Sequence, residues 1–239
     1  MNIAIIFAGG IGQRLNNKGA LPKQFLNIND KPILIYTLEI FEKHPKIDKI
    51  YLAVLSEYKD YAREMCEKYS INKLASIVDG GFCAMDSIYN ALVIANNENS
   101  DDSIVLIHDG VRPVLNPDVI DKNIESVEKF GNAITAIPCN ETIIVSEDSK
   151  TVEKVPIRKE TFRAQAPQSF ILKEVLEAHN KMREINPKYE DIVDNCTLYS
   201  ELDKETKMVE GNFGNIKVTT PEDVFVLKGI LEFMESQKA

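Results

Sequence analysis

Short apolar segments alternate with amphipathic segments of helical length through the first 138 residues. The expected strands are 3–8, 49–55, 75–78, 103–107 and 133–137, and the expected helices are 32–43, 57–69, 86–96 and 118–129. Parallel neighbours need crossover connections, and helices usually supply them. The alternation therefore predicts an α/β, Rossmann-like, doubly wound fold with a mostly parallel sheet and helices on both faces.

The pattern changes after residue 138. Segments 142–146 and 152–157 are typical of two strands joined by the turn residues 147–150. We interpret 139–162 as a β-hairpin arm inserted into a single domain that spans 1–239. A lone hairpin is marginally stable in water, so we expect the arm to pack on a second subunit. Helices at 173–183 and 192–202, a strand near 207–209 and a last helix capped by Thr220 should follow.

Composition excludes several classes of protein. The net charge of −9 argues against binding to nucleic acid or to an anionic membrane surface. No apolar run approaches the roughly 20 residues of a membrane span, and no signal peptide is expected. The four cysteines form no C-x-x-C pair and the three histidines show no metal-ligand spacing. These features predict a cytoplasmic protein with reduced thiols.

A glycine-rich segment follows the first expected strand. It reads Ala8, Gly9, Gly10, Ile11, Gly12, Gln13 and Arg14, and Lys23 comes after it. Glycines let backbone N–H groups approach a phosphate chain, and the two cations can hold its charge. A dinucleotide fingerprint would need glycine where Leu15 stands, and a P-loop would need Gly-Lys-Ser/Thr, which is absent. The segment predicts a nucleotide site, the alternative being a tight turn after a buried strand.

Further polar residues follow other expected strands. Gly80 and Gly81 follow the third strand, and Asp109 and Arg112 follow the fourth. Ligands of open α/β sheets bind at the carboxyl ends of strands, which favours one shared site. Asp109 can hold a metal or a hydroxyl-rich substrate, or cap a turn. Arg112 can hold a substrate phosphate or anchor its own loop.

Lys217 stands between Ile216 and Val218 on an expected short strand. A charge in such an apolar segment suggests a ligand contact. The alternative is a lysine that protects an edge strand from pairing with another chain.

Seven motifs in a fixed order resemble the family of cytidylyltransferases that load CMP onto polyol phosphates. They are AGGIGQRL, PKQF, DGG, HDGVRP, VPIR, APQSF and GNIKVTTPED, and the resemblance runs from residue 3 to about residue 231. It implies a nucleotidyltransferase fold of the GT-A-like type. It also implies CTP and a polyol phosphate as substrates, Mg²⁺ or another divalent cation as cofactor, and a homodimer formed through the arm.

The resemblance also implies a role for individual residues. Arg14, Lys23 and Lys217 match the catalytic cations around the triphosphate. The nucleotide-binding positions matched are Ala8, Gly9, Gly10, Gly12, Gly80, Gly81, Asp86 and Ser87. The acceptor positions matched are Asp109, Arg112 and Thr219, with Thr142 and Arg158 reaching the neighbouring subunit's site from the arm. Asp109 is also the candidate metal ligand.

Some positions depart from the family pattern. Ala84 stands where an arginine is common, and Ala166 where a threonine is common. The wording of 155–158 and 165–170 is closer to the branch that uses ribitol 5-phosphate (teichoic acid and capsule synthesis). Methylerythritol 4-phosphate, the acceptor in isoprenoid synthesis, is the alternative.

Two functions outside the cytidylyltransferase family are alternatives. A nicotinamide-dependent oxidoreductase is disfavoured by Leu15 and by the absence of an acidic residue at Leu55-Ser56. A noncatalytic nucleotide-binding relative has only Ala84 in its favour.

Overall fold

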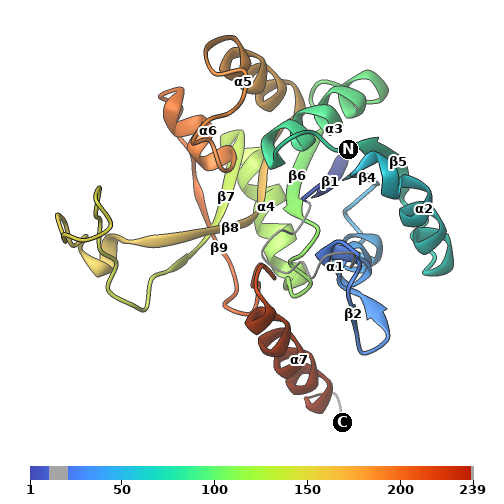
Figure 1. The fold of residues 1–239 in the computed structure, drawn as a ribbon. Coiled ribbons are helices and arrows are strands. Elements are labelled where there is room, and N and C mark those ends of the chain that lie inside the picture. Colours follow the sequence, from blue (N-terminus) through green and yellow to red (C-terminus); the bar gives the residue numbers. More distant parts are fainter. Residues whose placement is uncertain (11–20, 238–239) are drawn as a thin grey trace.

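The computed structural model describes residues 1–10 and 21–237 and contains a seven-stranded mixed sheet (Figure 1). The strands lie in the order β5 (Leu74–Asp79), β4 (Lys49–Val54), β1 (Asn2–Ala8), β6 (Ile104–Asp109), β8 (Phe162–Ile171), β7 (Asn132–Pro138) and β9 (Met208–Glu210). β1 pairs in parallel with β4 and β6, β4 with β5, and β7 with β9. The predicted α/β fold with a mostly parallel sheet is confirmed.

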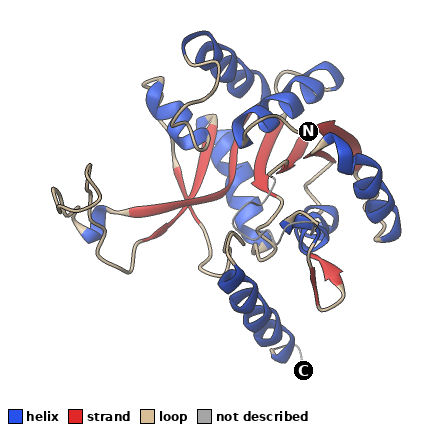
Figure 2. Ribbon diagram, viewed as in Figure 1, coloured by secondary structure: helices blue, strands red, loops and turns tan. Residues whose placement is uncertain are grey.

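Helices cover both faces of the sheet (Figure 2). One face packs on α1 (Ile33–Lys43), α2 (Lys59–Lys68) and α4 (Pro117–Phe130), and the other on α3 (Ala84–Glu98), α5 (Leu172–Ile185) and α6 (Asn195–Glu201). Side chains of β1 alternate between the two apolar cores, one on each face of the sheet. Ala4 and Ile6 lie in one core, and Ile3 and Ile5 lie in the other. No helix among the described residues has both the length and the apolar composition to cross a bilayer.

The sequence analysis missed β8, which lies inside the sheet and runs antiparallel to β6 and β7. Pro167 stands within this strand, and proline is rarely compatible with an internal strand because it cannot donate to the ladder. The register of β7 against β8 shifts between Ile134 and Ala136, opposite this part of β8. Thr135 Oγ1 donates to the carbonyl of Pro167 at 2.6 Å across that irregularity. The irregular ladder therefore accommodates the proline.

The arm was wrongly predicted as two strands. Between residues 139 and 161, only Val145 and Lys154 form a β-bridge, with Val145 N donating to Lys154 O at 2.8 Å. Ile144, Val155 and Ile157 are exposed. A two-stranded ladder needs a surface to pack on, and the arm extends away from the body of this chain (Figure 1).

The last helix, α7 (Pro221–Ser236), begins as predicted. Thr220 Oγ1 accepts from Asp223 N, and the Asp223 carboxylate accepts from Thr220 N at 2.8 Å, which completes a capping box. Leu227 is buried in a cluster that includes Val111 and Val218. The expected short strand around Lys217 does not form. Its segment is irregular and meets the loop after β6 through a 2.9 Å bond from Val218 N to Val111 O.

The remaining elements of the fold are short. They are the helical turns η1 (Lys23–Phe25), η2 (Ser56–Tyr58) and η3 (Arg158–Glu160), and the small hairpin of β2 (Asn27–Ile28) and β3 (Lys31–Pro32).

Candidate active site

A cleft of about 540 Å³ lies at the carboxyl ends of β1, β4, β5 and β6. Its walls include residues from both ends of the chain. Among those expected from the sequence are Gly9, Gly10, Lys23, Gly81, Asp109, Lys217 and Thr219. The structure therefore brings these seven predicted residues, which are far apart in the sequence, to one cleft, as the position of ligand sites in open α/β sheets predicts.

Glycines allow the turn after β1 and the turn after β5 to touch. A Cβ on Gly9 would lie 2.8 Å from Ser87 Oγ, and one on Gly80 would lie 3.2 Å from the Cα of Gly9. A Cβ on Gly81 would overlap the carboxylate of Asp86. Any larger residue would separate the two turns, so these glycines shape the cleft wall whatever the ligand is.

Ser87 and Asp86, in the first turn of α3, hold the turn 80–83 through hydrogen bonds. Ser87 Oγ accepts from Gly81 N and donates to Cys83 O, both at 2.9 Å. One oxygen of Asp86 accepts from Phe82 N at 3.3 Å. Ala84, at the position where the family pattern led us to expect an arginine, lines the cleft and contributes only a methyl group.

Gln24 is a site residue that the sequence analysis did not single out. Its side chain is buried, and Nε2 donates to the carbonyls of Ala8 at 2.6 Å and Gly10 at 3.3 Å. It therefore fixes the start of the glycine segment. The only signal was its place beside Lys23 in the PKQF motif.

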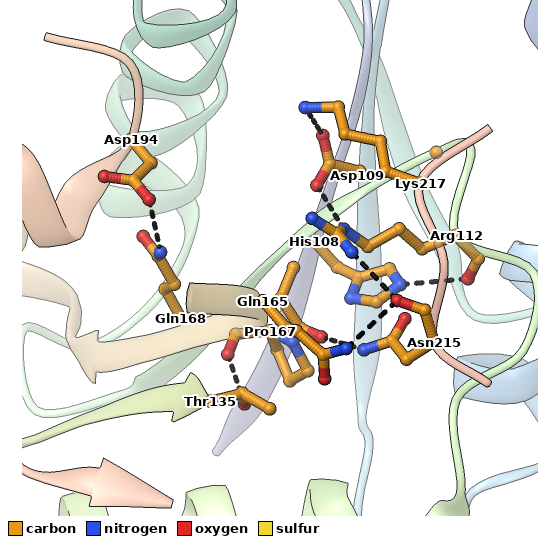
Figure 3. Close-up of polar contacts among 12 residues, drawn as sticks. His108, Asp109, Arg112, Thr135, Gln165, Pro167, Gln168, Asp194, Asn215 and Lys217 are labelled. Atoms are coloured by element: carbon orange, nitrogen blue, oxygen red, sulfur yellow. Dashed lines mark hydrogen bonds and ion pairs between the residues drawn. The ribbon is translucent and has the colours of Figure 1, made fainter. Parts of the chain in front are cut away.

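Asp109 lies between two cations (Figure 3). One carboxylate oxygen is 2.5 Å from Lys217 Nζ and the other accepts from Arg112 Nε at 2.7 Å. Burial alone would raise the pKa of Asp109, but the charges and hydrogen bonds of Lys217 and Arg112 outweigh it and hold the pKa at about 2. The trio is ionised and carries a net positive charge, which suits a phosphate rather than a cation.

His108 contacts the backbone of Arg112, one member of this trio. Its Nε2 lies 3.2 Å from the carbonyl of Arg112, to which it donates. Burial lowers the pKa of His108 to about 4, so the ring is neutral near pH 7. Arg112 is also held by the carbonyl of Asn215, which accepts from its Nη1 at 2.9 Å. These contacts orient Arg112.

A second cavity of about 180 Å³ adjoins the cleft and shares Phe7, Asp109 and Lys217 with it. Arg112, Gln165, Gln168, Asp194 and Asn195 provide its polar walls. Gln168 Nε2 donates to Asp194 Oδ2 at 2.9 Å (Figure 3). The two cavities meet at the Asp109–Lys217 pair, so a group placed there contacts occupants of both. None of the side chains from β8 and α6 was expected, because β8 itself was missed.

Other predicted residues lie elsewhere. Thr142 and Arg158 are on the arm, where Arg158 Nη2 donates to Thr142 Oγ1 at 2.9 Å. The arm extends away from the body of this chain (Figure 1), and neither Thr142 nor Arg158 lines the cleft. Gly12 and Arg14 fall outside the described residues, so their predicted roles stay predictions.

The structure offers little to hold a metal through protein groups alone. Within 1–10 and 21–237 there is no cluster of three or more His, Cys, Asp or Glu side chains able to bind one. Both oxygens of Asp109, the predicted ligand, are paired with cations.

Comparison with known proteins adds independent observations. The sequence profile of the 2-C-methyl-D-erythritol 4-phosphate cytidylyltransferase family matches residues 2–232. A ribitol-5-phosphate cytidylyltransferase of Streptococcus agalactiae serotype V is 39% identical over 238 residues, covering 100% of this chain and 98% of that protein. A 2-C-methyl-D-erythritol 4-phosphate cytidylyltransferase of Clostridium botulinum (strain Loch Maree) is 38% identical over 231 residues, covering 97% of each.

A solved structure is also similar. The crystal structure of 4-diphosphocytidyl-2C-methyl-D-erythritol synthase from Anaerococcus prevotii superposes with a TM-score of 0.81 at 26% identity, covering 97% of this chain and 96% of that one.

Proposed function

The chain belongs to the 2-C-methyl-D-erythritol 4-phosphate cytidylyltransferase family and is a cytidylyltransferase, and on that premise we propose that it makes CDP-ribitol. CMP would pass from CTP to D-ribitol 5-phosphate with release of pyrophosphate. The observation that carries this proposal is the meeting of two cavities at Asp109 and Lys217. The larger cavity suits the nucleotide and the smaller one the acceptor.

The reaction would be a direct in-line displacement. An oxygen of the acceptor phosphate attacks the α-phosphorus of CTP, and the bond from that phosphorus to the pyrophosphate oxygen breaks. Both reactants are anions, so catalysis depends on positioning and on neutralising charge. Lys217 would contact the α-phosphate, Arg112 the acceptor phosphate, and Lys23 with Arg14 the leaving pyrophosphate. The backbone of Gly9 and Gly10 would line the phosphate chain.

Nucleoside recognition would fall to the turn 80–83. Gly81, Phe82 and Cys83 of this turn line the cleft. Ser87 and Asp86, which the resemblance assigns to the nucleotide, would act largely by holding that turn.

The residues fit a Mg²⁺ that enters on the triphosphate rather than one held by the protein. Mg²⁺ commonly keeps several waters and binds through one or two carboxylates plus substrate phosphates. Asp109 is the carboxylate that lines the cleft, and it would have to exchange a cation for the metal. When bound, the ion would neutralise phosphate charge.

Ribitol 5-phosphate is favoured by the lining of the second cavity. Gln165, Gln168 and Asp194 line it beside Arg112. Gln168 and Asp194 are bonded to each other and to the start of α6, whereas Gln165 Oε1 is buried without a partner among the described residues and can accept from a substrate hydroxyl. Both acceptors carry a hydroxyl on each backbone carbon beyond the phosphate-bearing one. Ribitol has one such carbon more, whereas methylerythritol has a methyl branch that makes no hydrogen bond. Identity to relatives does not decide, since it is 39% to the ribitol enzyme and 38% to the methylerythritol enzyme.

Pyrophosphate release with CTP and Mg²⁺ tests the acceptor. We expect kcat/KM for ribitol 5-phosphate to exceed that for methylerythritol 4-phosphate by at least about 100-fold, because a site built to bind a substrate hydroxyl rejects an analogue that lacks it by more than that. The reverse preference would assign the chain to the alternative, 2-C-methyl-D-erythritol 4-phosphate cytidylyltransferase. No release with either acceptor would contradict both.

A further inference from the structure

Arg183 of α5 forms an ion pair with Asp86 in the first turn of α3, although 97 residues separate them. Arg183 Nη1 lies 2.5 Å from Asp86 Oδ1. The side chains are 33% and 14% exposed, so the pair is partly shielded from water. Such shielding makes the pair stronger than one on an open surface.

Aromatic contacts fix the guanidinium in place. It lies 4.3 Å from the ring centre of Tyr89 and 5.7 Å from that of Tyr189. Tyr189 is buried, and its Oη is 2.8 Å from His179 Nδ1. His179 Nε2 in turn contacts Asn195 Oδ1 at 2.9 Å. Arg183 is therefore pre-positioned by a buried network and does not have to find Asp86 from solvent.

The ion pair acts on the nucleotide cleft through one turn. The second oxygen of Asp86 accepts from Phe82 N, and Gly81 packs directly against the Asp86 carboxylate. Gly81 and Phe82 line the cleft, whereas Arg183 does not. A shift of the carboxylate would therefore move the cleft wall.

We propose that Arg183 is a positioning residue for the nucleotide. It holds the Asp86 carboxylate, which holds the turn 80–83 in the shape that accepts the nucleoside of CTP. The inference rests on the proposed function and adds a residue from a helix outside the cleft. The acceptor cavity does not include this turn, so the effect falls on the donor substrate alone.

Steady-state kinetics on the full-length protein test this role. Arg183→Met keeps much of the side chain's length but removes its charge. We expect KM for CTP to rise about tenfold, which corresponds to about 1.4 kcal/mol, while kcat and the acceptor KM change by less than about threefold. Arg183→Lys, which keeps the charge, should recover part of the CTP affinity. Lys181→Met, an exposed lysine of the same helix, is the matched control and should behave as wild type.

A double-mutant cycle separates positioning from general destabilisation. Combined with Asp86→Asn, Arg183→Met should add little to the CTP defect, because both act through one contact. Equal rises in both KM values, additive defects, or an Arg183→Met variant indistinguishable from Lys181→Met would overturn the inference. Thermal melting checks folding, and Arg183→Lys replaces Arg183→Met if the latter does not fold.

Calorimetric titration with CTP alone keeps this test apart from the proposed function. A wild-type protein that binds CTP but transfers it to neither acceptor would contradict the proposed function only. In that case, CTP affinity unchanged by Arg183→Met would still overturn the inference, and a selective loss would support it.

Discussion

The ammonium group of Lys23 donates a 3.1 Å hydrogen bond to the carbonyl of Val218, 195 positions later in the chain. Val218 N in turn donates to Val111 O, so three separate segments are tied together at the cleft. The contact places Lys23 beside the residue that follows Lys217. Lys23 and Lys217, which the family resemblance assigns together to the triphosphate, therefore line one cleft although 194 positions separate them.

Lys217→Ala should remove most of the turnover. The variant loses the cation at the junction of the two cavities, and loss of one such preorganised charge typically costs about 2–4 kcal/mol of barrier, or about 30- to 1000-fold in kcat. Pyrophosphate release measures the loss and circular dichroism checks the fold. Lys228→Ala, an exposed lysine of α7, is the control. Wild-type turnover in Lys217→Ala would remove Lys217 from the proposed chemistry.

Asp109→Asn should destabilise the protein at neutral pH. The substitution removes a buried anion and leaves Arg112 and Lys217 facing each other, so we expect a loss of about 2–4 kcal/mol in urea unfolding. Retained stability would show that solvent already screens the two cations.

The same carboxylate of Asp109 should contribute to the pH dependence of stability of the wild-type protein in acid. Its pKa is depressed from 3.8 to about 2, so its contribution to stability is present above pH 3.8 and is lost as pH falls toward 2. Asp109 should give no inflection in the rate between about pH 5 and 9. A step in kcat in that range that disappears in Asp109→Asn would contradict this assignment.

His179 should make the protein less stable in mild acid. Burial lowers its pKa to about 4, whereas the unfolded chain titrates near 6.5, so the unfolded state binds more protons between these values. The contribution of neutral His179 to the free energy of unfolding is therefore fully present above pH 6.5. It falls as the pH drops toward 4, by up to about 1.4 kcal/mol per pH unit. Urea unfolding at pH 7 and 5 should show a smaller difference in His179→Gln than in wild type. An unchanged difference would assign the slope to other groups.

The arm should supply residues to a neighbouring subunit. Ile144, Val155 and Ile157 are exposed on it, and neither Arg158 nor Thr142 lines this chain's own cleft. Deletion of residues 140–157 should give an inactive monomer by light scattering. An active monomer would contradict the proposed homodimer.

Mixing two inactive variants tests contribution in trans more directly. Arg158→Ala and Lys217→Ala each damage a different part of the site. In a mixed dimer, one site regains both residues, so random exchange of subunits should restore about a quarter of the wild-type sites. Without exchange of function between subunits, the mixture stays as inactive as its parts.

The sequence predicted local features well and long-range geometry poorly. The strand at 3–8 and the Thr220 cap depend on residues close in the chain, and both appear as expected. β8 was missed because Pro167 argues against an internal strand, and only its pairing with β6 and β7 reveals how the proline is accommodated. The arm strands were overpredicted because alternating apolar residues suggest pairing even where nothing covers them. Arg183 gave no signal, since its partner lies 97 residues away.

The meeting of two cavities at one aspartate divides the site into a part that is hard to change and a part that is easy to change. Substitution at Asp109 or Lys217 would disturb donor and acceptor together, whereas Gln165, Gln168 and Asp194 face the smaller cavity alone. If the larger cavity holds the nucleotide and the smaller one the acceptor, as proposed, substitutions in β8 and in the segment before α6 should change the acceptor and leave nucleotide binding intact. Libraries aimed at new CDP-polyols should be confined to those two segments.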